Sequence, residues 1–109
     1  MGISLPGPID LYFTSENAHD AAVLDRCFAA DATVRDEGRT IVGLAAIKAW
    51  RIEAARKYHH TVEPLAMAER DGKLVVTGRV AGDFPGSPID LRHIFEVDGD
   101  RIVSLEIRP

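Results

Sequence analysis

The hydrophobic pattern of this chain changes from helical to strand-like near His60, and this change limits the possible folds more than any other feature. Before His60, apolar residues recur at helical spacing. After it, Arg70-Asp-Gly-Lys73 and Asp98-Gly-Asp100 are typical of tight hairpins, and Phe84-Pro-Gly-Ser-Pro88 is a longer connection. A run of helices followed by a run of strands indicates an α+β fold.

The four strands expected in the second half should form an antiparallel sheet that is covered on one side only. Each has a single apolar face, such as Val103, Leu105 and Ile107 in the last strand. We place these strands at residues 60–69, 73–83, 88–97 and 101–108.

Three helices in the first half supply the cover for this sheet. Pro8 suits the first turn of a helix, and Asp20 is typical of the N-cap of a second helix that presents Phe28 inward. Gly43 precedes a third helix with apolar residues at helical spacing. Residues 32–42, between the second and third helices, are expected to form two short strands.

Length and charge describe an ordinary, mildly acidic chain. Its 109 residues suffice for one domain, residues 1–109, with a core of its own. The net charge is -4, and the Lys and Arg residues are scattered singly, which argues against a nucleic-acid partner. No run approaches the roughly 20 apolar residues that span a bilayer, so we expect no membrane partner either.

The single cysteine, Cys27, argues for a reducing compartment, because no intramolecular disulfide can form. We therefore expect a cytoplasmic protein. Cys27 lies beside Phe28 in an apolar stretch, which favours a small core residue over a reactive thiol.

Asp36 is the residue whose chemistry stands out. Residues two apart on a strand share a face, so Asp36 should point into the core behind Ala32 and Val34. A buried carboxylate is costly, and its raised pKa suits a general base. The alternative is that Asp36 caps a turn with Glu37 and Gly38.

Several other sites are unlikely on geometric grounds. His59 and His60 are adjacent at a helix-to-strand junction and should diverge, and no other cluster has metal-ligand spacing, so we expect no metal. No Gly-rich phosphate loop follows a strand, so we expect no nucleotide cofactor. Asp36 and Glu37 should face opposite ways on a strand and cannot act as paired carboxylates.

Three motifs resemble the NTF2-like superfamily, in particular its SnoaL-like and ketosteroid-isomerase-like branch. They are the Asp31-Ala-Thr-Val34 strand, the Gly43-Leu-Ala-Ala-Ile-Lys-Ala-Trp50 helix and the His93-Ile-Phe-Glu-Val-Asp-Gly99 hairpin. The resemblance implies three N-terminal helices packed on a curved antiparallel sheet in a cone shape, and a homodimer. The superfamily includes isomerases, cyclases, dehydratases and proteins that only bind ligands, so the fold alone does not determine function.

The resemblance also implies roles for individual residues. Asp36 matches the general base of the family, and Tyr12 matches the isomerases' hydrogen-bond donor to the enolate oxygen. Asp90, in Pro88-Ile-Asp90, resembles the second donor, an acid that the isomerases keep protonated. The match is imperfect, because two residues separate Asp90 from His93 where the isomerases have none.

Strand alternation favours His93 over Asp90 as the second polar group in the pocket. Leu91, His93 and Phe95 form the more apolar face of their strand, which leaves Asp90 outside unless a bulge near Pro88 turns it inward. Both interpretations stay open at this point. Glu16 is either at the rim of the pocket or an ordinary solvated residue.

These residues predict a small enzyme without a cofactor that moves a proton on an apolar carbonyl compound. Asp36 would be the base, and Tyr12 with His93 or Asp90 would hold the oxyanion. The apolar walls are assigned to Val34, Trp50, Met67, Val76, Phe84 and Phe95. The alternatives are a non-catalytic ligand-binding or dimerisation module, and an interaction protein that uses the outer sheet face.

Overall fold

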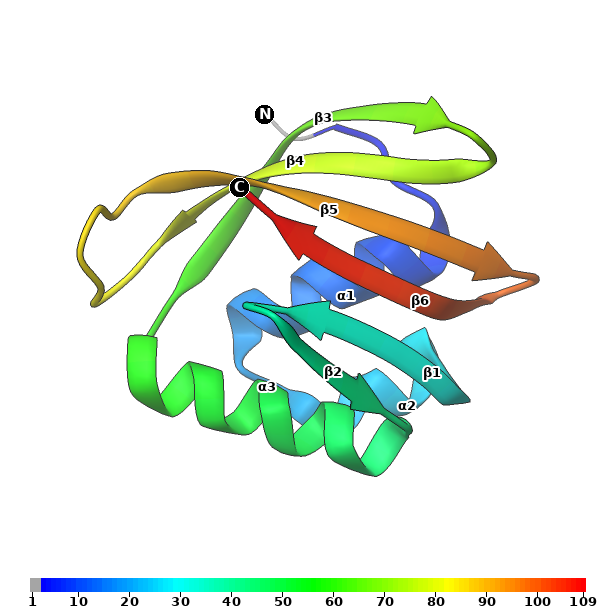
Figure 1. The fold of residues 1–109 in the computed structure, drawn as a ribbon, viewed down its shortest axis with the longest axis horizontal. Helices are drawn as coiled ribbons and strands as arrows, with labels where there is room; N and C mark the ends of the chain where they lie inside the picture. The colour runs from blue at the N-terminus through cyan, green and yellow to red at the C-terminus, as the bar shows by residue number, and fades with distance from the viewer. Residues whose placement is uncertain (1–2) are drawn as a thin grey trace.

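The chain forms three α-helices against one side of a curved six-stranded sheet in a computed structural model that describes residues 3–109 (Figure 1). The α-helices are α1 (Gly7–Ala18), α2 (Leu24–Cys27) and α3 (Leu44–Tyr58). The strands are β1 (Phe28–Asp36), β2 (Arg39–Val42), β3 (Thr61–Arg70), β4 (Lys73–Ala81), β5 (Ile89–Asp98) and β6 (Arg101–Arg108). The α+β class expected from the sequence is confirmed.

The sheet is mixed, whereas a purely antiparallel sheet was expected. Its strand order is β2-β1-β6-β5-β4-β3, and β1 pairs with β6 in parallel. The other four pairings are antiparallel. Hairpin signals specify only strands that are neighbours in sequence, so they contain no information on how β1 meets the last strand.

The two hairpins expected at residues 70–73 and 98–100 both form, since two residues join β3 to β4 and two join β5 to β6. Asp71 and Gly72 join β3 to β4 with φ angles of 53° and 78°, which are the left-handed values that such turns require. Glu37 and Gly38 join β1 to β2 in the same way, with φ of 52° and 76°. This turn ends β1 at Asp36 and thereby fixes the position of the carboxylate.

The second helix is shorter than expected. Asp20 accepts a hydrogen bond from the backbone N–H of Ala22, as an N-cap does, but only one turn of 3-10 helix (Ala21–Val23) and the four-residue α2 follow. Phe28, expected on this helix, is instead the first residue of β1. The apolar residues Leu24 and Phe28, four positions apart, are buried here, and their spacing fits a helix as well as a helix that ends where a strand begins.

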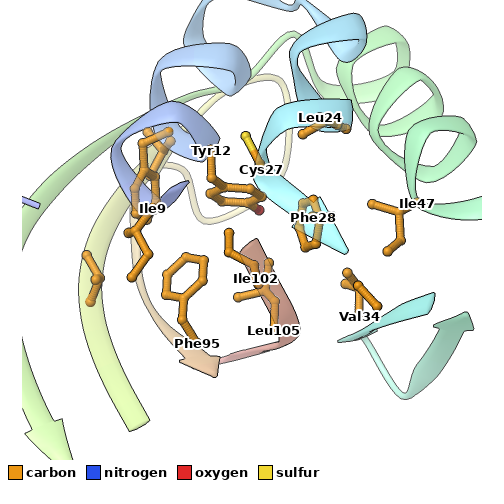
Figure 2. Close-up of a cluster of buried hydrophobic side chains, with 14 of the residues drawn as sticks. Ile9, Tyr12, Leu24, Cys27, Phe28, Val34, Ile47, Phe95, Ile102 and Leu105 are labelled. Atoms are coloured by element: carbon orange, nitrogen blue, oxygen red, sulfur yellow. The ribbon is translucent and has the colours of Figure 1, made fainter. Parts of the chain in front are cut away.

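The core lies between α1, α2, α3 and the concave face of the sheet. Figure 2 shows Tyr12 of α1 surrounded by Phe28, Phe95 and Ile102. Cys27 is fully buried in this cluster, and burial raises the pKa of its thiol to about 11, so it is a core residue. Ala32 and Val34 of β1 are also buried, which means that Asp36 shares their inward face.

Candidate functional site

A cavity of about 650 Å³ lies between α1, α3 and the concave face of the sheet. Its apolar walls come from α3 and from strands β4, β5 and β6, with Phe84 and Pro85 of the connection between β4 and β5. Its polar side chains include Glu16, Asp36, His60, His93, Glu106 and Arg108. An apolar cavity with a few convergent polar groups is typical of a binding site for a small molecule.

Asp36 lies in this cavity at the end of β1 and is half-buried. The indole N–H of Trp50, on α3, donates a hydrogen bond of 3.1 Å to Oδ2 of Asp36. Burial raises the pKa of Asp36, the Trp50 hydrogen bond opposes this shift, and the negative charges of Glu37 and Glu16 add to it. The result is a carboxylate whose pKa is moved toward neutral pH, as a general base requires.

His93 lies in the cavity on β5 and is 2% exposed. Burial lowers the pKa of His93, and the nearby carboxylate of Glu16 only partly opposes this. The imidazole is therefore neutral at neutral pH. Its ring packs closely on β4, where a Cβ on Gly78 would lie 3.2 Å from Cε1 of His93 and 2.9 Å from Cγ2 of Val62. A side chain at position 78 would therefore force Val62 and His93 to shift.

Glu16, Arg51 and His60 form a buried polar cluster beside the cavity. Oε2 of Glu16 lies 2.6 Å from Nε2 of His60, and Oε1 lies 3.8 Å from Nη2 of Arg51. All three residues are less than 10% exposed. Burial alone would raise the pKa of Glu16, but the His60 hydrogen bond and the charge of Arg51 together lower it, so Glu16 is ionised.

The contact between Glu16 and His60 is fixed by the backbone around it. Asn17, the next residue of α1, accepts a 2.7 Å hydrogen bond from the N–H of Val62 and donates a 2.8 Å bond to its carbonyl. On the other side, Gly82 approaches so closely that a Cβ would lie 2.7 Å from the carbonyl oxygen of Tyr58 and 3.0 Å from Cα of His60. The end of α1 is thereby held against the start of β3.

No pattern in the sequence indicates this cluster. Glu16 was left undecided between rim and solvent, and His60 was considered only as a metal ligand together with His59. The available signal was the helical spacing of Tyr12 and Glu16, which places Glu16 on the buried face of α1. The partner, His60, comes from a distant segment, and nothing in the sequence pairs the two.

Tyr12, expected as an oxyanion donor, is not among the residues that line the cavity. It is 1% exposed, and its ring meets Phe13, Phe28 and Phe95 edge-on in the core. The guanidinium of Arg51 lies over the ring, 4.7 Å from its centroid. Burial raises the pKa of Tyr12, which is consistent with a neutral core residue.

Asp90 lies on the outer face of the sheet, where Nε of Arg79 is 3.1 Å from its Oδ1. The pairing of β4 with β5 is regular past this point, with Arg79 opposite Asp90, and no bulge turns the carboxylate inward. The structure therefore places His93 and not Asp90 in the cavity.

Two of the six expected wall residues, Trp50 and Phe84, line the cavity. Val34, Val76 and Phe95 are fully buried in the core and do not reach it. Met67 is 40% exposed and lies in a shallow groove on the other face of the sheet. A bulge between Pro64 and Ala66 shifts the register of β3. Alternation counted from the start of the strand therefore does not give the face on which Met67 lies.

Neither a metal site nor a membrane span is found among residues 3–109. No group of three or more His, Cys, Asp or Glu side chains in this part of the chain could hold a metal ion. None of its helices has the length and apolar character needed to cross a bilayer.

Comparison with known proteins agrees with the fold. The model of the SnoaL-like domain matches residues 9–105. A Sinorhizobium meliloti structure described provisionally as a polyketide cyclase is 36% identical, with a TM-score of 0.91 and 95% of each chain covered. No curated protein matches the chain.

Two more distant structures share the fold alone. A Catenulispora acidiphila protein with a ketosteroid isomerase-like fold, in complex with trimethylamine, is 18% identical, with a TM-score of 0.83 over 97% of this chain and 87% of that one. An LEH-like epoxide hydrolase of Mycobacterium tuberculosis is 14% identical, with a TM-score of 0.74 over 92% and 77%. Because the family model matches residues 9–105 and the Sinorhizobium meliloti structure matches over 95% of each chain, the chain belongs to the family of SnoaL-like domains, with an NTF2-like fold.

Proposed function

We propose that this protein is a small enzyme that transfers a proton on an apolar carbonyl compound, with Asp36 as general base and no cofactor. The observation that supports this most is the position of Asp36, which lies in an apolar cavity with its Oδ2 3.1 Å from Nε1 of Trp50. Burial raises the pKa of the Asp36 carboxylate, and the hydrogen bond from Trp50 offsets only part of this increase.

The mechanism begins with a carbonyl compound bound against the apolar wall. Asp36 removes a proton from the carbon next to the carbonyl, and the electron pair moves to the carbonyl oxygen, which becomes an enolate. The neutral imidazole of His93 is the proposed hydrogen-bond donor to that oxygen, because it lines the same cavity and is shielded from bulk water. Return of the proton to a different carbon completes an isomerisation. In a cyclisation the enolate carbon attacks a second carbonyl group of the same molecule, whose oxygen takes the proton, and in a dehydration the bond to a β-hydroxyl breaks and that oxygen takes the proton and leaves as water.

The proposal can be tested with dihydrochalcone, an apolar ketone with two exchangeable protons next to its carbonyl group. Incubated with the protein in deuterium oxide, it should lose these protons by exchange, which proton NMR measures. Asp36→Asn should slow the exchange by roughly a hundredfold, as expected for loss of a general base.

The matched control is Asp31→Asn, because Asp31 lies on the same strand but is exposed. This variant should exchange the ketone at the wild-type rate. A carboxyl NMR titration of Asp36 provides a second test: a pKa at the ordinary aspartate value of 3.8 would contradict the proposal.

The second candidate function is a non-catalytic module that binds a small apolar molecule. It is favoured by the same apolar cavity, and it predicts that dihydrochalcone binds without any exchange.

We also propose a cytoplasmic homodimer, as family resemblance implies. The outer sheet face has the polar side chains of Arg79 and Asp90 and the exposed side chain of Met67, which suits a hydrated contact. Light scattering of the purified chain would measure its mass.

A further inference from the structure

The cavity is polar at one end and apolar at the other. Asp36 and Arg108 lie at the polar end, where β1 and β6 end side by side. The opposite end is formed by the last turns of α3 and by the connection between β4 and β5, which contributes Phe84. Glu16 and His60 also line the cavity, but they are bonded to each other and less than 10% exposed, so they offer it little surface. The apolar part of a ligand whose reacting carbon lies at Asp36 should therefore extend toward Phe84.

One face of α3 forms the wall between these two ends. Trp50, Ala54 and Tyr58 follow one another at intervals of four residues, so their side chains share a face of the helix. All three line the cavity and are only partly buried, which leaves them accessible to a bound molecule. A helix rises 1.5 Å per residue, so Trp50 and Tyr58 are about 12 Å apart along its axis.

The two aromatic rings of this wall are held in place. Trp50 donates its 3.1 Å hydrogen bond to Asp36 at the polar end. At the apolar end, the rings of Tyr58 and Phe84 meet edge-on with their centroids 5.9 Å apart, and the backbone N–H of Asp83 donates a 2.7 Å hydrogen bond to the carbonyl oxygen of Tyr58. Figure 1 shows the β4–β5 connection on the same side of the molecule as the end of α3. Tyr58 and Phe84 therefore form a fixed wall at the apolar end.

Ala54 is the small side chain between these two rings. Because alanine has only a methyl group, it leaves a space between Trp50 and Tyr58 that a larger side chain would fill. On the sheet side of the cavity, Leu91 and Ile107 supply apolar surface. A flat apolar group that lay against Ala54 would thus be enclosed by apolar atoms from the helix and from the sheet.

We infer that Ala54 determines how long a substrate this cavity accepts, and that the substrate is a carbonyl compound with a rigid apolar body of about two linked rings. This body lies along α3, from Asp36 to the wall formed by Tyr58 and Phe84. The inference rests on the proposed function for the placement of the reacting carbon at Asp36. It narrows the substrate from apolar carbonyl compounds in general to those with a long body on one side of the carbonyl group. Ala54 acts on specificity and takes no part in proton transfer.

Two matched methyl ketones test the length of the site. Acetophenone has one ring beside its carbonyl group, and 4-acetylbiphenyl has a second ring in line with the first. Titration calorimetry should show that 4-acetylbiphenyl binds the wild-type protein about thirtyfold more tightly, as expected when an additional ring the size of a Phe side chain is buried. In nuclear Overhauser spectra of this complex, the outer ring should lie near Tyr58 and Phe84, and the methyl group near Trp50.

A substitution at Ala54 separates a role in specificity from a general role in packing. Ala54→Leu fills the space between the two rings with a residue that also favours a helix. It should weaken the binding of 4-acetylbiphenyl by about tenfold, because the longer ketone then overpacks the site. Acetophenone is short enough to use the remaining volume of the cavity, so its affinity should change by less than about twofold.

Ala45→Leu is the matched control, because Ala45 lies on the same helix, is exposed and does not line the cavity. It should keep the full preference for 4-acetylbiphenyl. An equal loss of both ketones in Ala54→Leu would overturn the inference, since Ala54 would then not act on length. The spectra of the wild-type complex give an answer even if Ala54→Leu does not fold, and an outer ring remote from Tyr58 and Phe84 would also overturn the inference.

The possible results distinguish this inference from the proposed function, because exchange of the methyl protons in deuterium oxide tests Asp36 separately. Equal affinity for the two ketones, or a preference that Ala54→Leu leaves intact, overturns the inference alone if Asp36→Asn still slows the exchange. A preference that Ala54→Leu removes, without any exchange, supports the role of Ala54 and overturns Asp36 as the base. Binding of neither ketone overturns both.

Discussion

Two of the carboxylates that line the cavity, Asp36 and Glu16, have surroundings that move their pKa values in opposite directions. Asp36, at the end of β1, has one hydrogen-bond donor, the indole of Trp50, and its pKa is raised. Glu16, on α1, is more deeply buried but has His60 and Arg51 beside it, and its pKa is lowered. Burial is the largest contribution for both residues, so the partners account for the difference.

The difference shows how a small domain can keep two acids for two tasks. A carboxylate with a weak partner remains a base that can take up a proton, whereas one held between a guanidinium and a hydrogen-bonded imidazole remains ionised. Removing the partners or the charges one at a time tests this contrast.

The largest effect is expected from Arg51→Met. This change removes the cation from the Glu16 cluster and leaves a buried carboxylate with only His60 beside it. It should lower the free energy of unfolding by about 3 kcal/mol, the usual result of removing one member of a buried ion pair. Urea unfolding followed by fluorescence measures it.

Arg56→Met is the control for Arg51, since Arg56 lies on the same helix and is exposed. Its effect should stay within about 0.5 kcal/mol. If the two variants proved equally stable, Arg51 would contribute nothing to the cluster, and the lowered pKa of Glu16 would have to come from His60 alone.

Neutralising each carboxylate should change stability in opposite directions. Glu16→Gln removes a charge-assisted hydrogen bond and should cost about 2 kcal/mol at neutral pH. Asp36→Asn removes a charge that the fold disfavours and should stabilise by about 1 kcal/mol, in the range usual when a functional residue is replaced. Thermal unfolding at neutral pH gives both signs.

The pH dependence provides the sharper test of this opposition. The pKa of Glu16 is lowered, so its stabilisation is complete above the ordinary value of 4.5 and is lost as the pH falls through its folded-state pKa. The pKa of Asp36 is raised, so the penalty on its charge is absent below the ordinary value of 3.8 and grows as the pH rises through its folded-state pKa. Both variants should therefore approach wild-type stability in acid. A pair of variants that kept a constant offset at every pH would contradict these assignments.

Much of the fold could be predicted because its signals are local. The hairpin turn at Asp71-Gly72 and the alternation in β5 depend on neighbouring residues only, and the four strands of the second half begin within a residue of the expected positions. The first strand begins at Phe28, four residues before the expected start. The parallel pairing of β1 with β6 could not be predicted in this way, because no local pattern records which distant strands meet. The second helix is shorter than predicted, because an apolar pattern that spans so few residues does not distinguish the last turn of a helix from the start of a strand.

The site was predictable only where one strand determined it. Alternation along β1 brought Asp36 to the inner face, and alternation along β5 gave His93 and excluded Asp90. Family resemblance suggested Tyr12, but the aromatic rings around it keep its side chain in the core. The pair of Glu16 and His60 depends on the contact between Asn17 and Val62, which are 45 residues apart, and a single sequence does not reveal such a contact.

The smallest effect on stability is expected from Trp50→Phe, which changes only the weaker of the two environments. The substitution keeps an aromatic ring in the wall and removes the one N–H that donates to Asp36, so it should cost less than about 1 kcal/mol. The informative measurement is the carboxyl NMR titration of Asp36, because the lost hydrogen bond favoured the charged form and its removal should raise the pKa of Asp36 further.

Tyr58→Phe is the control, since Tyr58 lies on the same helix and lines the same cavity. It should leave the titration of Asp36 unchanged. If the titration were equally unaffected in Trp50→Phe, the contrast between the two carboxylates could no longer be attributed to the strength of their partners, and the depth of burial alone would have to explain it.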